Sequence, residues 1–157
     1  MAGQFRSYKW DPICIISQII AMQCLFYTSL SIWIVMMNVI VHNNSSLDQI
    51  FSYRILRYNE LNGRLLMIAF VLNSSTCALG LWYIVQRTKQ CLDYSTTVHV
   101  VHFLLCWCYN YQMPNTVAWW LLNLVCLILM TVTGEFLCMR TELKAIPVYL
   151  GGRVDLL

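Results

Sequence analysis

The chain has 157 residues, of which 59% are hydrophobic and only 11% charged, and its formal net charge is +3 at pH 7. Soluble domains are about 25% charged and about 45–50% apolar, so this composition excludes an ordinary soluble domain and predicts an all-α membrane protein. The few charged residues fall in short clusters between long apolar runs, and we expect those clusters to be the loops.

Four apolar segments are predicted to cross the membrane. About 20 helical residues are needed to span about 30 Å of hydrocarbon. The segments that qualify are 13–41, 65–86, 95–111 and 116–139. The first is long enough to tilt, and the third is short enough to need aromatic anchors at its ends. The expected fold is a four-transmembrane-helix bundle.

The loop from 42 to 64 is predicted to carry a short helix on the membrane surface. Ser46-Leu47-Asp48-Gln49 fits a capping box, apolar residues follow at helical spacing, and Gly63 is placed to end the helix. Asn43 and Asn44 each begin an N-x-S glycosylation sequon, but they directly follow the first span. Their glycosylation is left open.

The uneven distribution of the ten Lys and Arg residues predicts the orientation. Three of them belong to the 42–64 loop, namely Arg54, Arg57 and Arg64. The others lie on the side of the termini and the second loop, and they are Arg6, Lys9, Arg87, Lys89, Arg140, Lys144 and Arg153. Cytoplasmic loops carry the excess of positive charge, so both termini should be cytoplasmic.

Polar residues inside the spans are expected to join helices by hydrogen bonds, and the small residues around 75–80 are expected to allow close approach. The residues expected to bond across helix pairs are Gln18, Gln23, Asn73 and Asn123. Most of the eight cysteines lie in apolar runs and behave there as small hydrophobes. Cys91 and Cys138, at the cytoplasmic edge, are possible palmitoylation sites.

His99 and His102 share a helix face at i, i+3 and allow an alternative interpretation. In that interpretation the protein is a small polytopic transporter or membrane enzyme built around His99, His102 and Asn73, with Glu135 as a proton group. No third ligand is fixed beside them in the sequence, and no hydrolase or phosphate-loop motif is present. A structural role for the pair is therefore favoured, and we expect no catalytic group, metal, cofactor or nucleic-acid partner.

Glu135 interrupts the last apolar run. If the fourth span is centred near Leu127 or Ile128, Glu135 lies roughly 11–12 Å from the bilayer centre, close to its boundary. Arg140 and Lys144 follow it in the sequence. This position fits an interfacial ion pair better than a proton-translocation site.

Several stretches, in order, resemble the Sys family of four-span Golgi membrane proteins. The most specific are 87–94 (RTKQCLDY) with 97–102 (TVHVVH), and 134–147 (GEFLCMRTELKAIP). The others are 5–12 (FRSYKWDP), 46–49 (SLDQ), 76–81 (TCALGL) and the pair Trp119-Trp120. The resemblance covers about residues 3–147 and implies a Sys-like four-span domain over 1–147, with 148–157 as a short cytoplasmic tail.

The resemblance also implies a role. Family members are Golgi receptors that recruit an ARF-related small GTPase to trans-Golgi membranes by recognising its acetylated N-terminal segment. The GTPase in turn brings in ARF-like GTPases and golgins, and membrane lipids are the remaining partners. We place the binding surface, as a hypothesis, on Arg87, Lys89, Asp93, Glu135, Arg140 and Glu142. The alternative is that these six are flanking charges that only set topology.

Overall fold

The computed structural model describes residues 11–154, and their regular secondary structure is entirely helical. Arg6 and Lys9, used above to predict the orientation, lie outside the described residues. The long helices are α1 (Pro12–Val41), α3 (Leu61–Ile84), α4 (Cys91–Asn110) and α5 (Val117–Val154). The short ones are α2 (Asp48–Phe51) and the 3₁₀ turns η1 (Tyr53–Ile55) and η2 (Thr88–Gln90).

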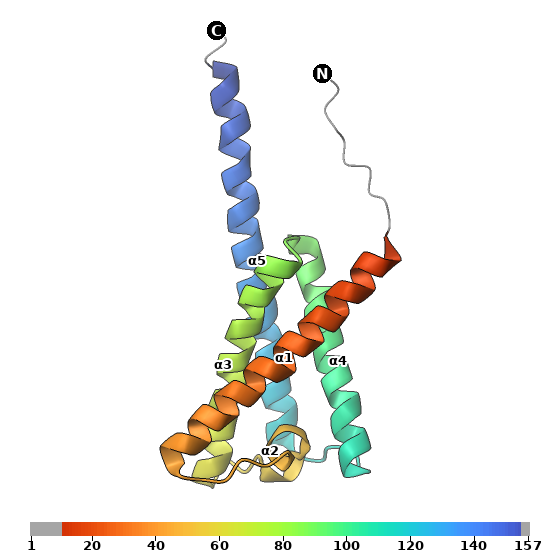
Figure 1. The fold of residues 1–157 in the computed structure, drawn as a ribbon, viewed down its shortest axis with the longest axis vertical. Helices are drawn as coiled ribbons and strands as arrows, with labels where there is room; N and C mark the ends of the chain where they lie inside the picture. Colours follow the sequence, from red (N-terminus) through yellow and green to blue (C-terminus); the bar gives the residue numbers. More distant parts are fainter. Residues whose placement is uncertain (1–10, 155–157) are drawn as a thin grey trace.

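The four long helices form one bundle, and consecutive ones run in opposite directions (Figure 1). α1 crosses obliquely in front of α3 and α5, and α3 makes its most extensive contacts with these two helices. The loop with α2 and η1 lies at one end of the bundle, and the turn with η2 lies at the other. α1 begins at the η2 end, and α5 continues past that end.

The oblique path of α1 follows from its buried residues. Met22, Phe26, Leu30 and Ile34 recur at every fourth position and are all buried. A row at this spacing is inclined to the helix axis, so a helix that buries it crosses its neighbours at an angle. Gly80 of α3 lies where a Cβ atom would meet the side chain of Leu25 on α1. A small residue in this part of α3 therefore allows the close approach that the sequence predicted.

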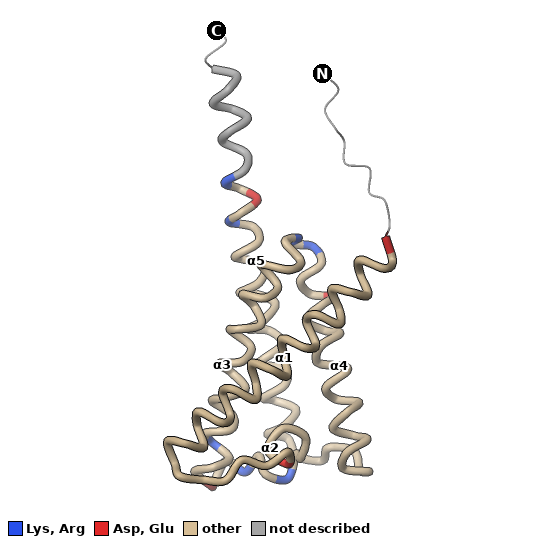
Figure 2. Tube along the Cα trace, in the orientation of Figure 1, with Lys and Arg blue, Asp and Glu red and all other residues tan. Residues whose placement is uncertain are grey.

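Three described segments are long and apolar enough to cross a membrane: Pro12–Val41, Leu61–Ile84 and Val117–Lys144. The expectation of an all-α fold is confirmed for the described residues, with three candidate membrane-spanning helices rather than the four predicted. α4 packs in the same bundle, and it starts before the predicted span, so that Asp93 lies in its first turn. α5 continues beyond 139 to Val154 and so takes in most of the predicted tail. In Figure 2 the charged residues gather at the two ends of the bundle.

The helix predicted in the 42–64 loop differs from the structure in three details. The helical segment is interrupted after Phe51, and its N-cap is Leu47 with no side-chain cap bond, because Gln49 hydrogen-bonds to Asn38 of α1 instead. Gly63 ends no helix: it lies in the first turn of α3, where a Cβ atom would collide with the backbone of Arg57. Tertiary contacts, rather than local capping preferences, decide both positions.

Candidate partner-binding surface

The six charged residues singled out from the sequence come from two segments that pack together at the η2 end of the bundle. We call Arg87, Lys89, Asp93, Glu135, Arg140 and Glu142 the charged rim. α3 ends where Gln86 adopts a left-handed conformation, with φ of 54°, which reverses the chain into η2. η2 packs on α5, and the Thr88 backbone N–H donates a hydrogen bond to Glu142 Oε1 at 3.4 Å.

A second set of contacts holds α5 against the end of α3. The indole nitrogen of Trp82 donates to the hydroxyl of Thr141 at 2.7 Å. Gly134 is buried, and a Cβ atom there would lie 3.0 Å from Cδ1 of Leu81. The stretch of α5 from 134 to 142 therefore runs beside the α3–α4 turn. This brings together residues that are about fifty positions apart in the sequence.

Exposed apolar side chains lie among the charges of the rim. Phe136, Met139 and Leu143 are 53%, 46% and 56% exposed, and their i, i+3, i+7 spacing places them on one side of α5. We call these three the apolar stripe. Sequence reasoning missed the stripe because it treated this part of α5 as the end of a span, although its helical spacing was visible. Of the rim residues, only Glu135 is partly buried.

The ion pair expected for Glu135 is not formed. Among the described residues no salt bridge joins Glu135 to Arg140 or Lys144. An ion pair between Arg57 and Glu60, at 3.6 Å, lies in the loop at the opposite end. The reason is geometric. Positions i+5 and i+9 are turned about 140° and 180° away from residue i on an α-helix. Glu135 therefore cannot pair with either of these two cations along α5.

The two thiols proposed for palmitoylation face each other below the rim. Cys91 Sγ lies 3.7 Å from Cys138 Sγ and 3.4 Å from the carbonyl oxygen of Arg87, and both side chains are buried. Acylation of either sulfur stays a prediction. It requires the contact between α4 and α5 to open, because the sulfurs are covered in this arrangement.

Two of the four polar residues that were expected to hydrogen-bond across helix pairs do so. Gln18 of α1 donates to the carbonyl of Ile84 at 3.2 Å and accepts from Tyr94 at 2.7 Å, so it joins α1, α3 and α4. Asn73 accepts from Ser29. The prediction was wrong for the other two: Gln23 has no partner among the described residues, and Asn123 bonds within its own helix.

The histidine pair lies inside the bundle, away from the rim. His102 is fully buried, with Phe26, Phe51 and Phe70 ring centroids 5.5–6.4 Å away. The hydroxyl of Tyr27 lies 3.3 Å from its Nδ1 atom. His99 Nδ1 is 2.9 Å from the Ser95 carbonyl of its own helix. Among the described residues no group of three or more His, Cys, Asp or Glu side chains could hold a metal. The surroundings fit a packing role.

Comparison of the sequence with known proteins places the chain in a family. The family described as "Integral membrane protein S linking to the trans Golgi network" matches residues 5–148. The Protein SYS1 homolog of Nematostella vectensis is 54% identical over 151 residues, which cover 96% of each chain. That of Dictyostelium discoideum is 40% identical over 96% of this chain and 65% of its own length.

A more distant relative matches the same share of this chain. Protein SYS1 of Saccharomyces cerevisiae is 22% identical over 96% of this chain and 73% of the yeast protein. No solved structure matches the chain significantly. The match spans both segments of the charged rim and all four long helices up to residue 148. The chain therefore belongs to the SYS1 family, whose members are described as integral membrane proteins linked to the trans-Golgi network.

Proposed function

We propose that this protein is a four-span receptor of the trans-Golgi membrane that recruits an ARF-related small GTPase through its acetylated N-terminal segment. The recruited GTPase then brings in ARF-like GTPases and golgins, and so supports vesicle traffic and protein transport. The proposal involves no catalytic step. The observation that carries it is the charged rim with its apolar stripe, at the end of the bundle from which α5 continues outward (Figure 1).

The proposed topology places the η2 end in the cytosol. α4 supplies the fourth crossing, because its 20 residues give about 30 Å of helix, the thickness of the hydrocarbon core. Arg87, Lys89, Arg140 and Lys144 lie at the η2 end, and Arg54, Arg57 and Arg64 at the other. With Arg6 and Lys9 of the N-terminal segment, the positive charge favours a cytosolic η2 end.

The chemistry of the rim suits a segment that is both apolar and polar. A GTPase with one weak membrane anchor binds membranes reversibly and needs a second attachment to stay there. The apolar stripe can cover the apolar side of such a segment, while the rim offers charges of both signs to its polar side. Acetylation removes the positive charge of the amino terminus, so burying that end costs less desolvation energy.

Affinity capture of the full-length protein in detergent tests partner and mechanism together. The bait is the N-terminal peptide of the GTPase, either acetylated or with a free amine. We expect retention on the acetylated peptide and much weaker retention on the unacetylated one. Equal retention on both, or on neither, would contradict the proposal.

A charge-reversed receptor tests the surface. We expect Glu135→Lys to keep its Golgi position but to leave the GTPase in the cytosol, because it reverses a charge at the base of the rim. The control is Glu60→Lys, which reverses a charge in the loop at the opposite end of the bundle. Recruitment that survives Glu135→Lys would mean that this carboxylate only marks the edge of the membrane.

A further inference from the structure

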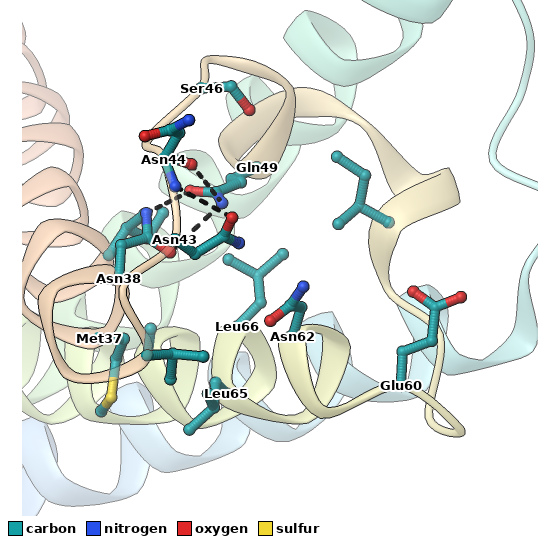
Figure 3. Close-up of a pocket in the computed structure, with 14 residues that line it drawn as sticks. Met37, Asn38, Asn43, Asn44, Ser46, Gln49, Glu60, Asn62, Leu65 and Leu66 are labelled. Atoms are coloured by element: carbon teal, nitrogen blue, oxygen red, sulfur yellow. Dashed lines mark hydrogen bonds between the residues drawn. The ribbon is translucent and has the colours of Figure 1, made fainter.

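A pocket of about 240 Å³ lies at the α2 end of the bundle, far along the bundle from the charged rim (Figure 3). Met37 and Val41 near the end of α1, with Leu65 and Leu66 near the start of α3, give it an apolar side. The residues of the intervening loop give it a polar side that is rich in side-chain amides. The pocket is therefore amphipathic, and it lies where two membrane-spanning helices meet a loop.

The polar side is held in place by hydrogen bonds between amides. Asn38 Nδ2 donates to Gln49 Oε1 at 2.7 Å, and Gln49 Nε2 donates back to Asn38 Oδ1 at 3.3 Å. Gln49 Nε2 also lies 3.4 Å from the carbonyl oxygen of Asn44. These bonds tie the loop to α1, so the pocket is formed without a ligand.

Two other side-chain amides, those of Asn43 and Asn62, have hydrogen-bonding groups that no described residue uses. Asn43 Oδ1 accepts from the Asn44 backbone N–H at 3.0 Å, and within the described part of the chain its Nδ2 group has no partner. The side chain of Asn62 likewise makes no hydrogen bond to any described residue. Both line the pocket, and Figure 3 shows their amides directed into it. The pocket thus offers donors and acceptors side by side.

The charges around the pocket disfavour an anionic ligand. None of the described lining residues is Lys or Arg, and the one carboxylate among them, Glu60, lies 3.6 Å from Arg57 outside the lining. A phosphate-bearing headgroup would find no cation on the pocket wall. An uncharged group with hydroxyl and amide functions can use the amides as donors and as acceptors.

We propose that this pocket binds the uncharged, hydroxyl- and amide-bearing headgroup of a membrane lipid, such as a ceramide. The volume equals roughly eight water molecules and falls below the roughly 300–1,000 Å³ of pockets for drug-sized ligands, so it holds a headgroup and not the acyl chains. The acyl chains extend out of the pocket into the surrounding lipid. Under the proposed topology the site faces the lumen, and it does not depend on GTPase recruitment.

Photo-crosslinking of the full-length protein in lipid nanodiscs tests the site. Three probes share one photoactivatable acyl chain and carry a ceramide, a diacylglycerol or a phosphatidic acid headgroup. We expect the ceramide probe to label peptides from 34–41 or 60–69 most strongly, and excess unlabelled ceramide to remove that label. Equal labelling by diacylglycerol, or stronger labelling by phosphatidic acid, would overturn the proposal.

Two variants distinguish binding in the pocket from nonspecific labelling by the surrounding lipid. Asn62→Leu removes an amide that makes no hydrogen bond to described residues, so the fold should be kept, and ceramide labelling should fall by up to about tenfold. Asn115→Leu makes the same change at an exposed asparagine outside the lining, in the loop between α4 and α5, and should label like the wild type. The melting temperature of both variants is the check on folding. Unchanged labelling of Asn62→Leu in a folded protein would refute the site.

Discussion

The hydroxyl of Ser29 on α1 donates a hydrogen bond to the side-chain oxygen of Asn73 on α3, and both residues are buried between the two helices. The sulfur of Cys77, one turn along α3, lies 3.9 Å from each of these two oxygens. The side-chain nitrogen of Asn73 has no partner among the described residues. Because unpaired polar groups are costly in an apolar interior, this bond helps to fix which faces of α1 and α3 meet.

We expect Ser29→Ala to lower the free energy of unfolding by about 1 kcal/mol, since it leaves the Asn73 oxygen with only the weak thiol donor of Cys77, 3.9 Å away. Adding Asn73→Leu should recover most of this loss, because it replaces the unpaired amide by an apolar group of similar size. The measurement is unfolding of the purified protein by SDS titration. Thr28→Ala is the matched control, since Thr28 is exposed and bonds only to the Cys24 carbonyl of its own helix. A Ser29→Ala effect no larger than that of Thr28→Ala would contradict the prediction.

Gly80 gives a second test of the contact between α1 and α3. Gly80→Ala should be mild, because the atom its Cβ would meet belongs to the flexible side chain of Leu25. Gly80→Val should cost about 1–3 kcal/mol through overpacking and should lower the melting temperature in detergent. Leu79→Val, at the exposed neighbouring position, is the control. If Gly80→Val melted like Leu79→Val, the close approach of the two helices would be wrong.

Much of the bundle could be predicted because it depends on properties of single segments. The lengths of the apolar segments and the positions of the charged residues between them predicted the long helices. They also predicted that the six rim residues lie at one end of the bundle. The loop from 42 to 60 could not be predicted in detail, because Gln49 satisfies Asn38 instead of capping its own helix. The contact between Thr88 and Glu142 joins residues far apart in sequence, and no local pattern signals it.

The facing thiols of Cys91 and Cys138 allow the packing of α4 on α5 to be checked. With the other six cysteines replaced by serine or alanine, mild oxidation should join this pair, since their sulfurs are only 3.7 Å apart. Proteolysis between α4 and α5 should then leave the fragments connected until a reductant is added. A protein that keeps only Cys91 and Cys126 is the control, because Cys126 also lies on α5 but about 18 Å along that helix from Cys138. Equal crosslinking in both proteins would mean that the pair is not preferentially in contact.

Substitution of the histidine pair distinguishes the proposed receptor function from a transporter or enzyme function. We expect His99→Leu with His102→Leu to retain GTPase recruitment and to lower the melting temperature, because the Tyr27 hydroxyl loses its partner. Adding Tyr27→Phe should restore part of the stability. The measurements are Golgi localisation of the GTPase and thermal unfolding in detergent. Recruitment lost at normal protein levels would instead assign a functional role to the two histidines.

The apolar stripe should contribute directly to partner affinity. Met139→Gln with Leu143→Gln keeps side-chain length and removes apolar surface next to the rim. If the GTPase segment covers both side chains, which are already about half buried, each contributes roughly 1 kcal/mol, and the loss of both should weaken binding of the acetylated peptide by at least about tenfold. Titration of the peptide into the detergent-solubilised full-length protein measures the change. Leu47→Gln with Tyr58→Gln removes exposed apolar surface from the loop at the opposite end and should bind like the wild type. Unchanged affinity after the Met139 and Leu143 substitutions would place the docking surface elsewhere.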